Sequence, residues 1–391
     1  MIFLTIGLFL IYPILTVPLI LLGSIVDKKN RIIYMILLAF DIALISMKLD
    51  PSKYGLDLNV YFSIMDIMKG IKWETFIHTY SSQKEFLTNV LYFVFASIGN
   101  YHLWIFAVTF ICYAAMFYII TDYSQIKNIS NKEYVIMILL LLLFYNNIFV
   151  ITGVRNSLAM IIYILALYEE YFKENKKLVY KILYIIPCFI HMSMALGILL
   201  RIAMIFYKKP NKKYIIVLII IYAISPSVVL SIASKLNGTA IFSDLYAKTS
   251  KYTGDGANIL NNVYNMIKII AFLNLFVIFE KIHAKQDSKI KNITELICIF
   301  TLFSLNYAVI RDRWYDACIV LLILSFIDKI EIYFNIKGIH KIILGGTAIF
   351  MLIQQTNTLN KLDYSELIKN NYKTTMIEFF GKEKDGQIYN S

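Results

Sequence analysis

Long apolar stretches separated by short lysine-rich loops constrain the fold of this chain more than any other feature. Its 391 residues are 59% hydrophobic and only 16% charged, and the mean hydropathy is +0.65. Several apolar stretches reach the roughly 20 residues that a helix needs to cross the hydrocarbon core of a bilayer. A soluble domain of this size would expose far more charge. The sequence therefore predicts an all-α fold, a polytopic integral membrane helical bundle.

The predicted bundle has about 12 membrane segments, counting short or re-entrant ones. Residues 86–98 are too short to cross the bilayer, and we expect a partial or re-entrant helix there. Residues 177–207 form one apolar stretch broken near Pro187 and His191, which favours a tight hairpin. Residues 2–26 lack a basic leading region and a small-residue cleavage site, so we expect a retained helix. The other segments are expected near 31–48, 101–121, 134–151, 154–169, 214–234, 263–279, 294–310, 314–328 and 342–355.

The distribution of basic residues predicts which loops face the cytoplasm. Six loops together contain 20 basic residues, and loops rich in lysine and arginine stay on the cytoplasmic side. The net charge of +12 is then explained by membrane topology and not by nucleic acid binding. These six loops are 27–31, 122–133, 169–181, 208–213, 280–292 and 329–341. Residues 1–355 are predicted to form the helical domain, with outer loops 49–85 and 235–262 and a polar outer tail, 356–391.

The longer outer loop, 49–85, contains its own helical pattern. Leu58, Ile64, Ile67 and Met68 follow the spacing of an apolar helix face. We expect this face to lie along the membrane interface.

The spacing of the cysteines and the absence of nucleotide-binding motifs both argue against a cofactor. Cys112, Cys188, Cys298 and Cys318 all fall inside apolar stretches without metal-ligand spacing, so buried thiols are expected instead of a disulfide or a zinc site. The chain has no P-loop and no GxGxxG motif. The sequence predicts no metal and no cofactor, and any chemistry must use a donor already in the membrane.

Arginine is rare in this chain, and its positions are informative. Five arginines stand against 33 lysines, and Arg155, Arg311 and Arg313 fall at predicted outer ends of membrane segments, the last two in a turn over 311–313. The planar guanidinium group grips phosphate through two parallel hydrogen bonds, which lysine cannot do. This pattern favours a lipid-linked phosphate as ligand. Two simpler interpretations are that Arg155 reaches lipid headgroups and that the other two arginines pair with Asp312 and Asp316.

Four further residues could take part in chemistry beside these arginines. His191 lies within an apolar stretch, where a histidine is as often a hydrogen-bonded core residue. Asp57 and Tyr61 are four residues apart and would share one helix face. Glu85 directly precedes the short segment 86–98. Either carboxylate could also be a solvated surface acid.

Taken together, these features resemble the EpsG family, relatives of the Wzy-type polymerases of bacterial surface polysaccharide. The motifs of the resemblance are, in order, Asp57-x-x-x-Tyr61, Glu85 before an apolar segment, Arg155-x-x-Leu158-Ala159, a lysine-rich turn from Lys173 to Lys181, His191-Met192-Ser193, and Arg313-Trp314-Tyr315. The chain departs from the family pattern at Phe86, because members often have proline after the glutamate.

The resemblance implies a membrane glycosyltransferase of the bacterial plasma membrane, with its active site facing outside. Its substrate would be an oligosaccharide repeat unit on undecaprenyl diphosphate, polymerised at the outer leaflet into capsule, O-antigen or exopolysaccharide. A flippase and a chain-length regulator of the same pathway are further candidate partners, beside the lipid bilayer. The implied site comprises His191, Asp57 and Glu85 as catalytic candidates, Arg155, Arg311 and Arg313 for the diphosphate, and Tyr61, Trp314 and Tyr315 for the sugar.

The chemistry of such a reaction fits these residue types. Cleavage of a sugar–diphosphate bond passes through an oxocarbenium-like transition state while negative charge builds on the leaving diphosphate. Arginines in a water-poor site would stabilise that charge in place of a metal. The attacking hydroxyl needs a base, and we favour His191 because its ordinary pKa lies near neutrality.

Three other functions remain open from the sequence. A transporter or flippase of the same lipid-linked sugar would bind the diphosphate without cleaving it, although such proteins usually contain inverted repeats. A ligase that moves finished polysaccharide to lipid A would use the arginines in the same way. A membrane acyltransferase would not need the outer arginines.

Overall fold

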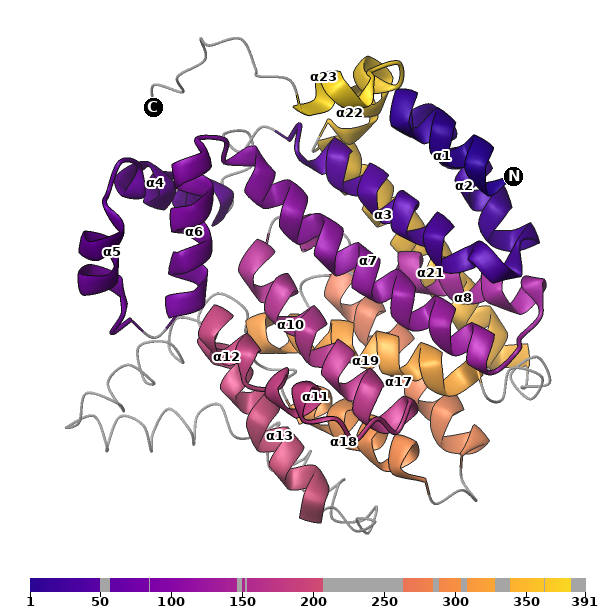
Figure 1. Ribbon diagram of the computed structural model, residues 1–391. Helices are drawn as coiled ribbons and strands as arrows, with labels where there is room; N and C mark the ends of the chain where they lie inside the picture. The colour runs from indigo at the N-terminus through magenta and orange to yellow at the C-terminus, as the bar shows by residue number, and fades with distance from the viewer. Residues whose placement is uncertain are drawn as a thin grey trace. The chain divides into compact units, whose positions relative to one another are not determined.

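The computed structural model describes residues 1–49, 57–83, 85–145, 150–151, 153–206, 263–283, 288–303, 308–327, 338–361 and 363–380. All regular structure in these ranges is helical, as Figure 1 shows, and the prediction of an all-α fold is confirmed for them. The chain divides into two compact units. The first unit comprises residues 1–197 and 352–391, and the second comprises residues 198–351.

The first unit is organised around the long helix α7 (His102–Ile126). Its 25 residues give it a length of roughly 37 Å at about 1.5 Å per residue. Helix α3 (Arg31–Ser46) packs along it, as seen in Figure 1, and α10 (Val154–Leu167) packs against it as well. Apolar side chains cover α7 on all sides, which is typical of a core helix or a membrane span. Among the described residues, α7 is the one helix both long and apolar enough to cross a membrane.

The N-terminal segment is not the single helix that we predicted over residues 2–26. It forms α1 (Ile2–Ile11) and α2 (Pro13–Val26), separated at Tyr12. Pro13 has no backbone N–H, and its ring disfavours the helical conformation of the preceding residue. Tyr12 accordingly has φ −130° and ψ 83°. The break thus follows from the position of this proline.

Three helices follow in the predicted outer loop and beyond it: α4 (Asp57–Met68), α5 (Trp73–Tyr80) and α6 (Phe86–Ile98). Helix α6 forms over the residues predicted for the short segment, and it ends at Gly99, which has φ +77°. The predicted apolar face of α4 is only partly right. Its buried residues are Leu58, Tyr61, Met65 and Met68, whereas Ile67 is 67% exposed. Helical spacing places Tyr61 and Met65 in line with Leu58, and Ile67 falls outside that line.

The apolar stretch 177–207 is broken, as predicted, but in two places. Short helices α11 (Leu178–Ile182) and α12 (Ile186–Ile190) precede the 3-10 turn η4 (Met192–Met194) and α13 (Ala195–Phe206). His191 leaves the helical conformation with φ −148° and ψ 118°. Pro187 is in the first turn of α12, where its missing N–H costs no helical hydrogen bond.

A polar network joins the end of α7 to the π-helical turn η3 (Tyr168–Phe172) that follows α10. Lys173 Nζ lies 3.0 Å from Asp122 Oδ2 and 3.4 Å from Glu169 Oε1, and it donates to the Tyr118 hydroxyl. Burial lowers the pKa of Lys173, but the hydrogen bonds to Tyr118 and Asp122 and the charge of Asp122 raise this pKa by more. The ammonium group therefore stays charged at neutral pH.

The second unit contains α17 (Val263–Ile282), α18 (Lys289–Phe303), α19 (Ala308–Ile327) and most of α21 (Gly338–Lys361). Helix α19 packs against both α17 and α18. The outer turn predicted over residues 311–313 is wrong, because these residues lie inside the first turns of α19. Charged residues indicated a turn there, but they are compatible with a helix start.

Helix α21 runs through the predicted boundary at residue 355, and α22 (Tyr364–Asn371) and α23 (Met376–Phe380) follow it. Phe380 contacts the rings of Phe40 and Phe106 in the first unit. The predicted segment 214–234 and outer loop 235–262 lie outside the described residues. The predicted division into a helical domain and a tail stays a prediction.

All four cysteines are free thiols. Cys112, Cys298 and Cys318 are buried, as predicted, whereas Cys188 is half-buried.

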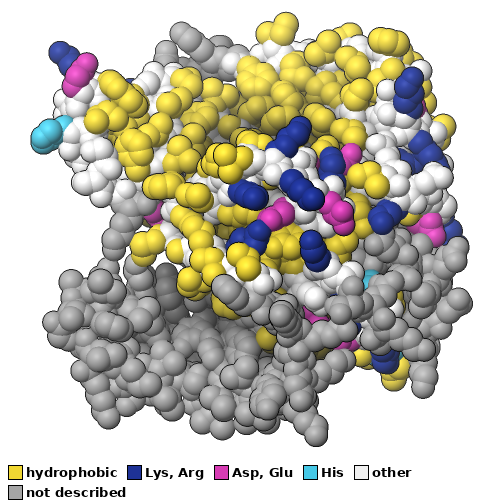
Figure 2. All heavy atoms as spheres, turned by 60° about the horizontal axis from the view of Figure 1, so that its bottom comes forward, with side chains coloured by type: hydrophobic (Ala, Val, Ile, Leu, Met, Phe, Trp, Pro, Cys, Tyr) yellow, Lys and Arg dark blue, Asp and Glu magenta, His cyan; other side chains and the backbone are white. Residues whose placement is uncertain are grey.

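Large hydrophobic side chains are also exposed on the described surface. In α1, Phe3 is 87% exposed and Leu4 is 64% exposed. Figure 2 shows a face on which hydrophobic side chains cover wide areas around a central group of Lys, Arg, Asp and Glu side chains. Apolar surface of this extent is unusual for a soluble monomer.

The packing of α2 on α3 leads to a stability prediction. A Cβ atom at Gly23 would overlap the buried ring of Tyr34, whereas a Cβ atom at Gly7 would meet nothing within 4 Å. We expect Gly23→Ala to destabilise the purified protein by about 1–3 kcal/mol, because overpacking forces neighbours apart. Thermal unfolding in detergent measures this, with Gly7→Ala as the control expected to be neutral or stabilising. Equal unfolding midpoints for the two variants would contradict the described packing.

Candidate catalytic site

Arg155 is in the first turn of α10, two residues after the N-cap residue Gly153. The start of a helix carries the positive end of the helix dipole, so a cation there is unfavourable without an anionic partner. Glu85 supplies that partner from the start of α6, 70 residues earlier in the chain. Arg155 Nη1 donates to Glu85 Oε2 at 2.6 Å, and both side chains are 25% exposed. The predicted arginine and one predicted carboxylate therefore form an ion pair.

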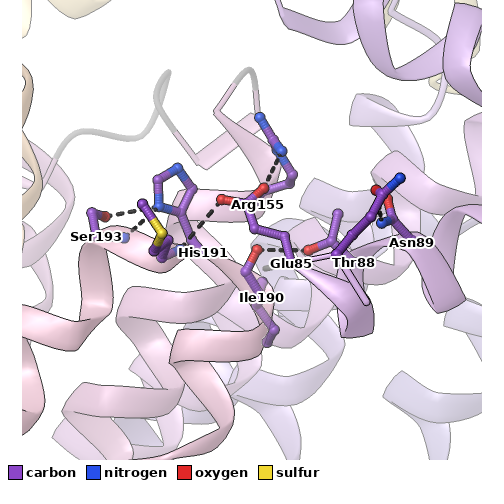
Figure 3. A network of polar contacts seen from close by, with 9 residues as sticks. Glu85, Thr88, Asn89, Arg155, Ile190, His191 and Ser193 are labelled. Carbon is purple, nitrogen blue, oxygen red and sulfur yellow. Dashed lines mark hydrogen bonds and ion pairs between the residues drawn. The ribbon is translucent and has the colours of Figure 1, made fainter. Parts of the chain in front are cut away.

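The same carboxylate also contacts the segment that carries His191. Met192 N donates to Glu85 Oε1 at 3.3 Å, so the two oxygens of one carboxylate connect two distant segments. In Figure 3 the Glu85 carboxylate lies between Arg155 and the His191 segment. A second link is buried, where Thr88 Oγ1 donates to the carbonyl of Ile190 at 2.7 Å. These bonds hold the break between α12 and η4 against the start of α6.

His191 is oriented by its neighbour Ser193. The backbone N–H of Ser193 donates to His191 Nδ1 at 3.2 Å, and Ser193 Oγ lies 2.8 Å from the same nitrogen. Because Nδ1 accepts a hydrogen bond, the neutral ring carries its proton on Nε2. In this tautomer the ring presents a hydrogen-bond donor at Nε2 and not a base.

Tyr61 supports Arg155 from α4. The guanidinium carbon of Arg155 lies 4.9 Å from the centroid of the Tyr61 ring, a cation–π arrangement. Tyr61 stacks on Tyr92 of α6 at 5.6 Å, and Tyr92 meets the ring of Trp104 at the start of α7. Tyr61 is only 1% exposed, so in this structure its ring is packed beneath the arginine. Its predicted role in sugar binding stays a prediction.

Asp57 begins α4, one turn before Tyr61. Its side chain lies outside the described part of the structure, so its predicted role as a base stays a prediction. Its backbone position on α4 agrees with the shared helix face predicted for the two residues.

The remaining predicted site residues belong to α19 of the second unit. Trp314 and Tyr315 are 2% and 3% exposed; Trp314 packs against Phe300, and Lys268 lies 4.4 Å from the Tyr315 ring centroid. The side chains of Arg311 and Asp312 lie outside the described residues. Arg155 belongs to the first unit, and its predicted gathering with Arg311 and Arg313 stays a prediction.

Several contributing residues were not predicted as site members. Thr88 and Ser193 position the His191 segment, and Tyr92 supports Tyr61. Lys268 is a buried cation within a predicted apolar segment, 3% exposed, and its charge alone could have marked it in the sequence. Thr88 and Tyr92 carry no such signal, because each is an ordinary residue of an apolar helix.

Two buried polar atoms beside the ion pair point to unused bonding capacity. Arg155 Nε and Asn156 Oδ1 have no hydrogen-bond partner among the described residues. Unsatisfied buried groups are rare in native proteins and often mark a ligand site or a strained site. Across the described ranges, no group of three or more His, Cys, Asp or Glu side chains could hold a metal ion.

Comparison with known proteins identifies the family. No curated protein and no solved structure is significantly similar to this chain. The sequence model of the EpsG family, which is membrane-associated and linked to exopolysaccharide polymerisation, matches residues 50–370. The match covers most of the chain, so the resemblance is confirmed and this protein belongs to the EpsG family.

Proposed function

We propose that this protein is a membrane glycosyltransferase that polymerises oligosaccharide repeat units carried on undecaprenyl diphosphate. Family membership supports a polymerase-type function in polysaccharide biosynthesis. The observation that carries the finer proposal is the Glu85–Arg155 pair, a half-buried guanidinium group at the start of α10. A guanidinium group there can stabilise the negative charge that builds on the leaving diphosphate.

The site combines several sources of positive potential. Arg155 lies at the N-terminus of α10. The N-terminus of a second helix, α6, begins beside it, directly after its N-cap residue Glu85. Helix N-termini offer backbone N–H groups and a positive dipole end to anions. The neutral His191 ring would add an Nε2–H donor. A diphosphate group would therefore find charge and hydrogen-bond donors in place before the reaction begins.

In the proposed reaction, a hydroxyl oxygen of the acceptor sugar attacks the anomeric carbon of the donor sugar. The bond from that carbon to the diphosphate oxygen breaks, and the new glycosidic bond forms. A base takes the hydroxyl proton, and undecaprenyl diphosphate leaves with its negative charge held by Arg155. Arg311 and Arg313 are further candidates for this charge.

The base is proposed among the predicted carboxylates and His191. With its proton on Nε2, His191 is better suited to donate a hydrogen bond to the diphosphate. Both oxygens of Glu85 already accept hydrogen bonds, so Glu85 is better suited to position Arg155. Asp57, at the start of α4, is then the favoured base.

We further propose that the protein is a polytopic helical bundle of the bacterial plasma membrane, with this site facing outside. The length of α7, the exposed apolar side chains of α1 and the basic loops support this topology. The repeat units would reach the site within the outer leaflet. A flippase and a chain-length regulator would act before and beside this enzyme.

The first test of the proposed function is the variant Arg155→Lys. This variant keeps the positive charge but loses the bidentate hydrogen bonds to phosphate. We therefore expect the rate of polysaccharide chain formation to fall by roughly 100-fold or more. Purified protein mixed with lipid-linked repeat units in detergent measures the products. The same substitution at Arg201, which is not a proposed site residue, is the matched control. Wild-type chain lengths from Arg155→Lys would contradict the role of Arg155. Unchanged substrate with the wild-type protein would favour a carrier.

A second prediction concerns the carboxylate that holds Arg155. Glu85→Gln keeps the side-chain shape but removes the charge that orients the guanidinium group. We expect the polymerisation rate to fall at least tenfold. The free energy of unfolding should fall by only ~1 kcal/mol, because the ion pair is partly exposed. Rate assays and thermal unfolding distinguish the two effects. Glu74→Gln, at an exposed glutamate of α5, should leave both unchanged. If the loss of rate were accompanied by a large fall in the unfolding midpoint, Glu85 would instead have a structural role.

A further inference from the structure

A basic cavity lies at the opposite end of α7 from the Glu85–Arg155 pair. Its volume is about 290 Å³. Lys28, Lys29 and Arg31 line one side, from the connection between α2 and α3. The other side is formed by the end of α7, including Ser124 and Gln125.

The cavity is separate from the candidate catalytic site. The candidate catalytic site lies near the start of α7, where Trp104 contacts Tyr92. The cavity lies near the end of α7, where Ser124 lines it. The 20 residues between these positions span roughly 30 Å of helix, about the thickness of the hydrocarbon core of a bilayer. If α7 crosses the membrane as proposed, the cavity lies at the headgroups of the opposite leaflet.

The charge of the cavity is not neutralised by ion pairs. Arg31 is 1% exposed, and its Nε donates to the Ser24 carbonyl at 2.7 Å. Its Nη2 donates to Asn131 Oδ1 at 3.0 Å, and its guanidinium carbon lies 3.9 Å from the centroid of the Tyr134 ring. None of these partners is an anion. Within the described ranges, none of the three basic residues of the cavity forms an ion pair with a carboxylate.

Asp27, the acid that precedes Lys28 in the sequence, already accepts other hydrogen bonds. Its carboxylate accepts hydrogen bonds from the backbone N–H and the side-chain amide of Asn30. The hydrogen bond from the Asn30 side chain lowers the pKa of Asp27, so this carboxylate is ionised at neutral pH. The residues that line the cavity include three bases and no acid, so the lining carries a net positive charge.

Hydrogen bonds across the cavity hold its two sides together. Gln125 Nε2 donates to the Lys28 carbonyl at 2.6 Å, and Lys28 Nζ donates to the Ile129 carbonyl at 3.3 Å. Asn128 adopts φ +49°, which turns the chain at the end of α7. The segments are about 100 residues apart in sequence, and these bonds build a defined site from them.

We propose that this cavity binds the phosphate ester of an anionic ligand at the cytoplasmic face of the membrane. Its volume lies at the small end of the usual range for ligand pockets, roughly 300–1,000 Å³, which suits a phosphate and its immediate substituents better than a nucleotide sugar. The phosphate could belong to an anionic phospholipid headgroup, which is abundant at that face, or to a water-soluble phosphate ester. The membrane location rests on the topology proposed above, whereas the phosphate chemistry does not.

The test uses the full chain and two probes. Thermal unfolding is followed in nanodiscs of phosphatidylcholine with and without phosphatidylglycerol, and in detergent with increasing inorganic phosphate. The variant Lys28→Gln/Lys29→Gln removes two cavity charges. The control Lys127→Gln/Lys132→Gln removes two nearby charges, one at the end of α7 and one at the start of the helix Asn131–Phe144, and neither residue lines the cavity. The comparison uses the shift in the unfolding midpoint that each probe causes. The absolute midpoint is not compared, because Lys28→Gln also loses the hydrogen bond from Lys28 Nζ to the Ile129 carbonyl.

We expect at least one probe to raise the unfolding midpoint of the wild-type protein. The cavity variant should need at least tenfold more probe, and the control should respond like the wild type. A shift with phosphatidylglycerol alone assigns a lipid headgroup, and a shift with inorganic phosphate assigns a soluble ester. No shift with either probe, or equal losses in the cavity and control variants, would overturn the proposal. Polymerisation by the cavity variant in phosphatidylcholine reports separately on the proposed function.

Discussion

The arrangement of the candidate site depends on one unfavourable placement, a guanidinium group at the positive end of a helix dipole. Arg155 stays in the first turn of α10 because Glu85 neutralises it and Tyr61 lies beneath it. The same carboxylate accepts a hydrogen bond from Met192, so one interaction also positions the His191 segment. A diphosphate carries more negative charge than one carboxylate and would compete for the same guanidinium group. In the proposed mechanism, the pair holds the arginine in position while the site is free of substrate.

Sequence reasoning found the members of this cluster but not their contacts. Arg155, Glu85 and His191 each stood out because a charged or titratable residue beside an apolar stretch is costly without a role. Glu85 contacts Arg155, 70 positions away, and the backbone of Met192, 107 positions away. Such contacts depend on how α6, α10 and α12 pack, which local periodicity does not specify. Thr88 could not be recognised, because its hydroxyl matters only through the Ile190 carbonyl that packing brings to it.

The errors in the predicted helices also have physical causes. The break at Tyr12 could have been predicted from Pro13, since the residue before a proline avoids the helical conformation. The turn predicted over residues 311–313 was inferred from charge, yet charged residues are compatible with the first turns of a helix. On α4 the buried face includes Tyr61, an aromatic residue that we had interpreted only as a sugar ligand. The sequence thus predicted the all-α fold of the described residues correctly, and it predicted helix ends and faces less well.

The most direct test of the central claim is an experimental structure with a non-cleavable undecaprenyl-diphosphate sugar bound. If Arg155 holds the leaving group, phosphate oxygens will lie within about 3.2 Å of its guanidinium nitrogens, with Glu85 still beside them. The sugar will then lie between Arg155 and α4. A diphosphate bound away from the start of α10, with Arg155 contacting only Glu85 and Tyr61, would contradict the proposed role of this arginine.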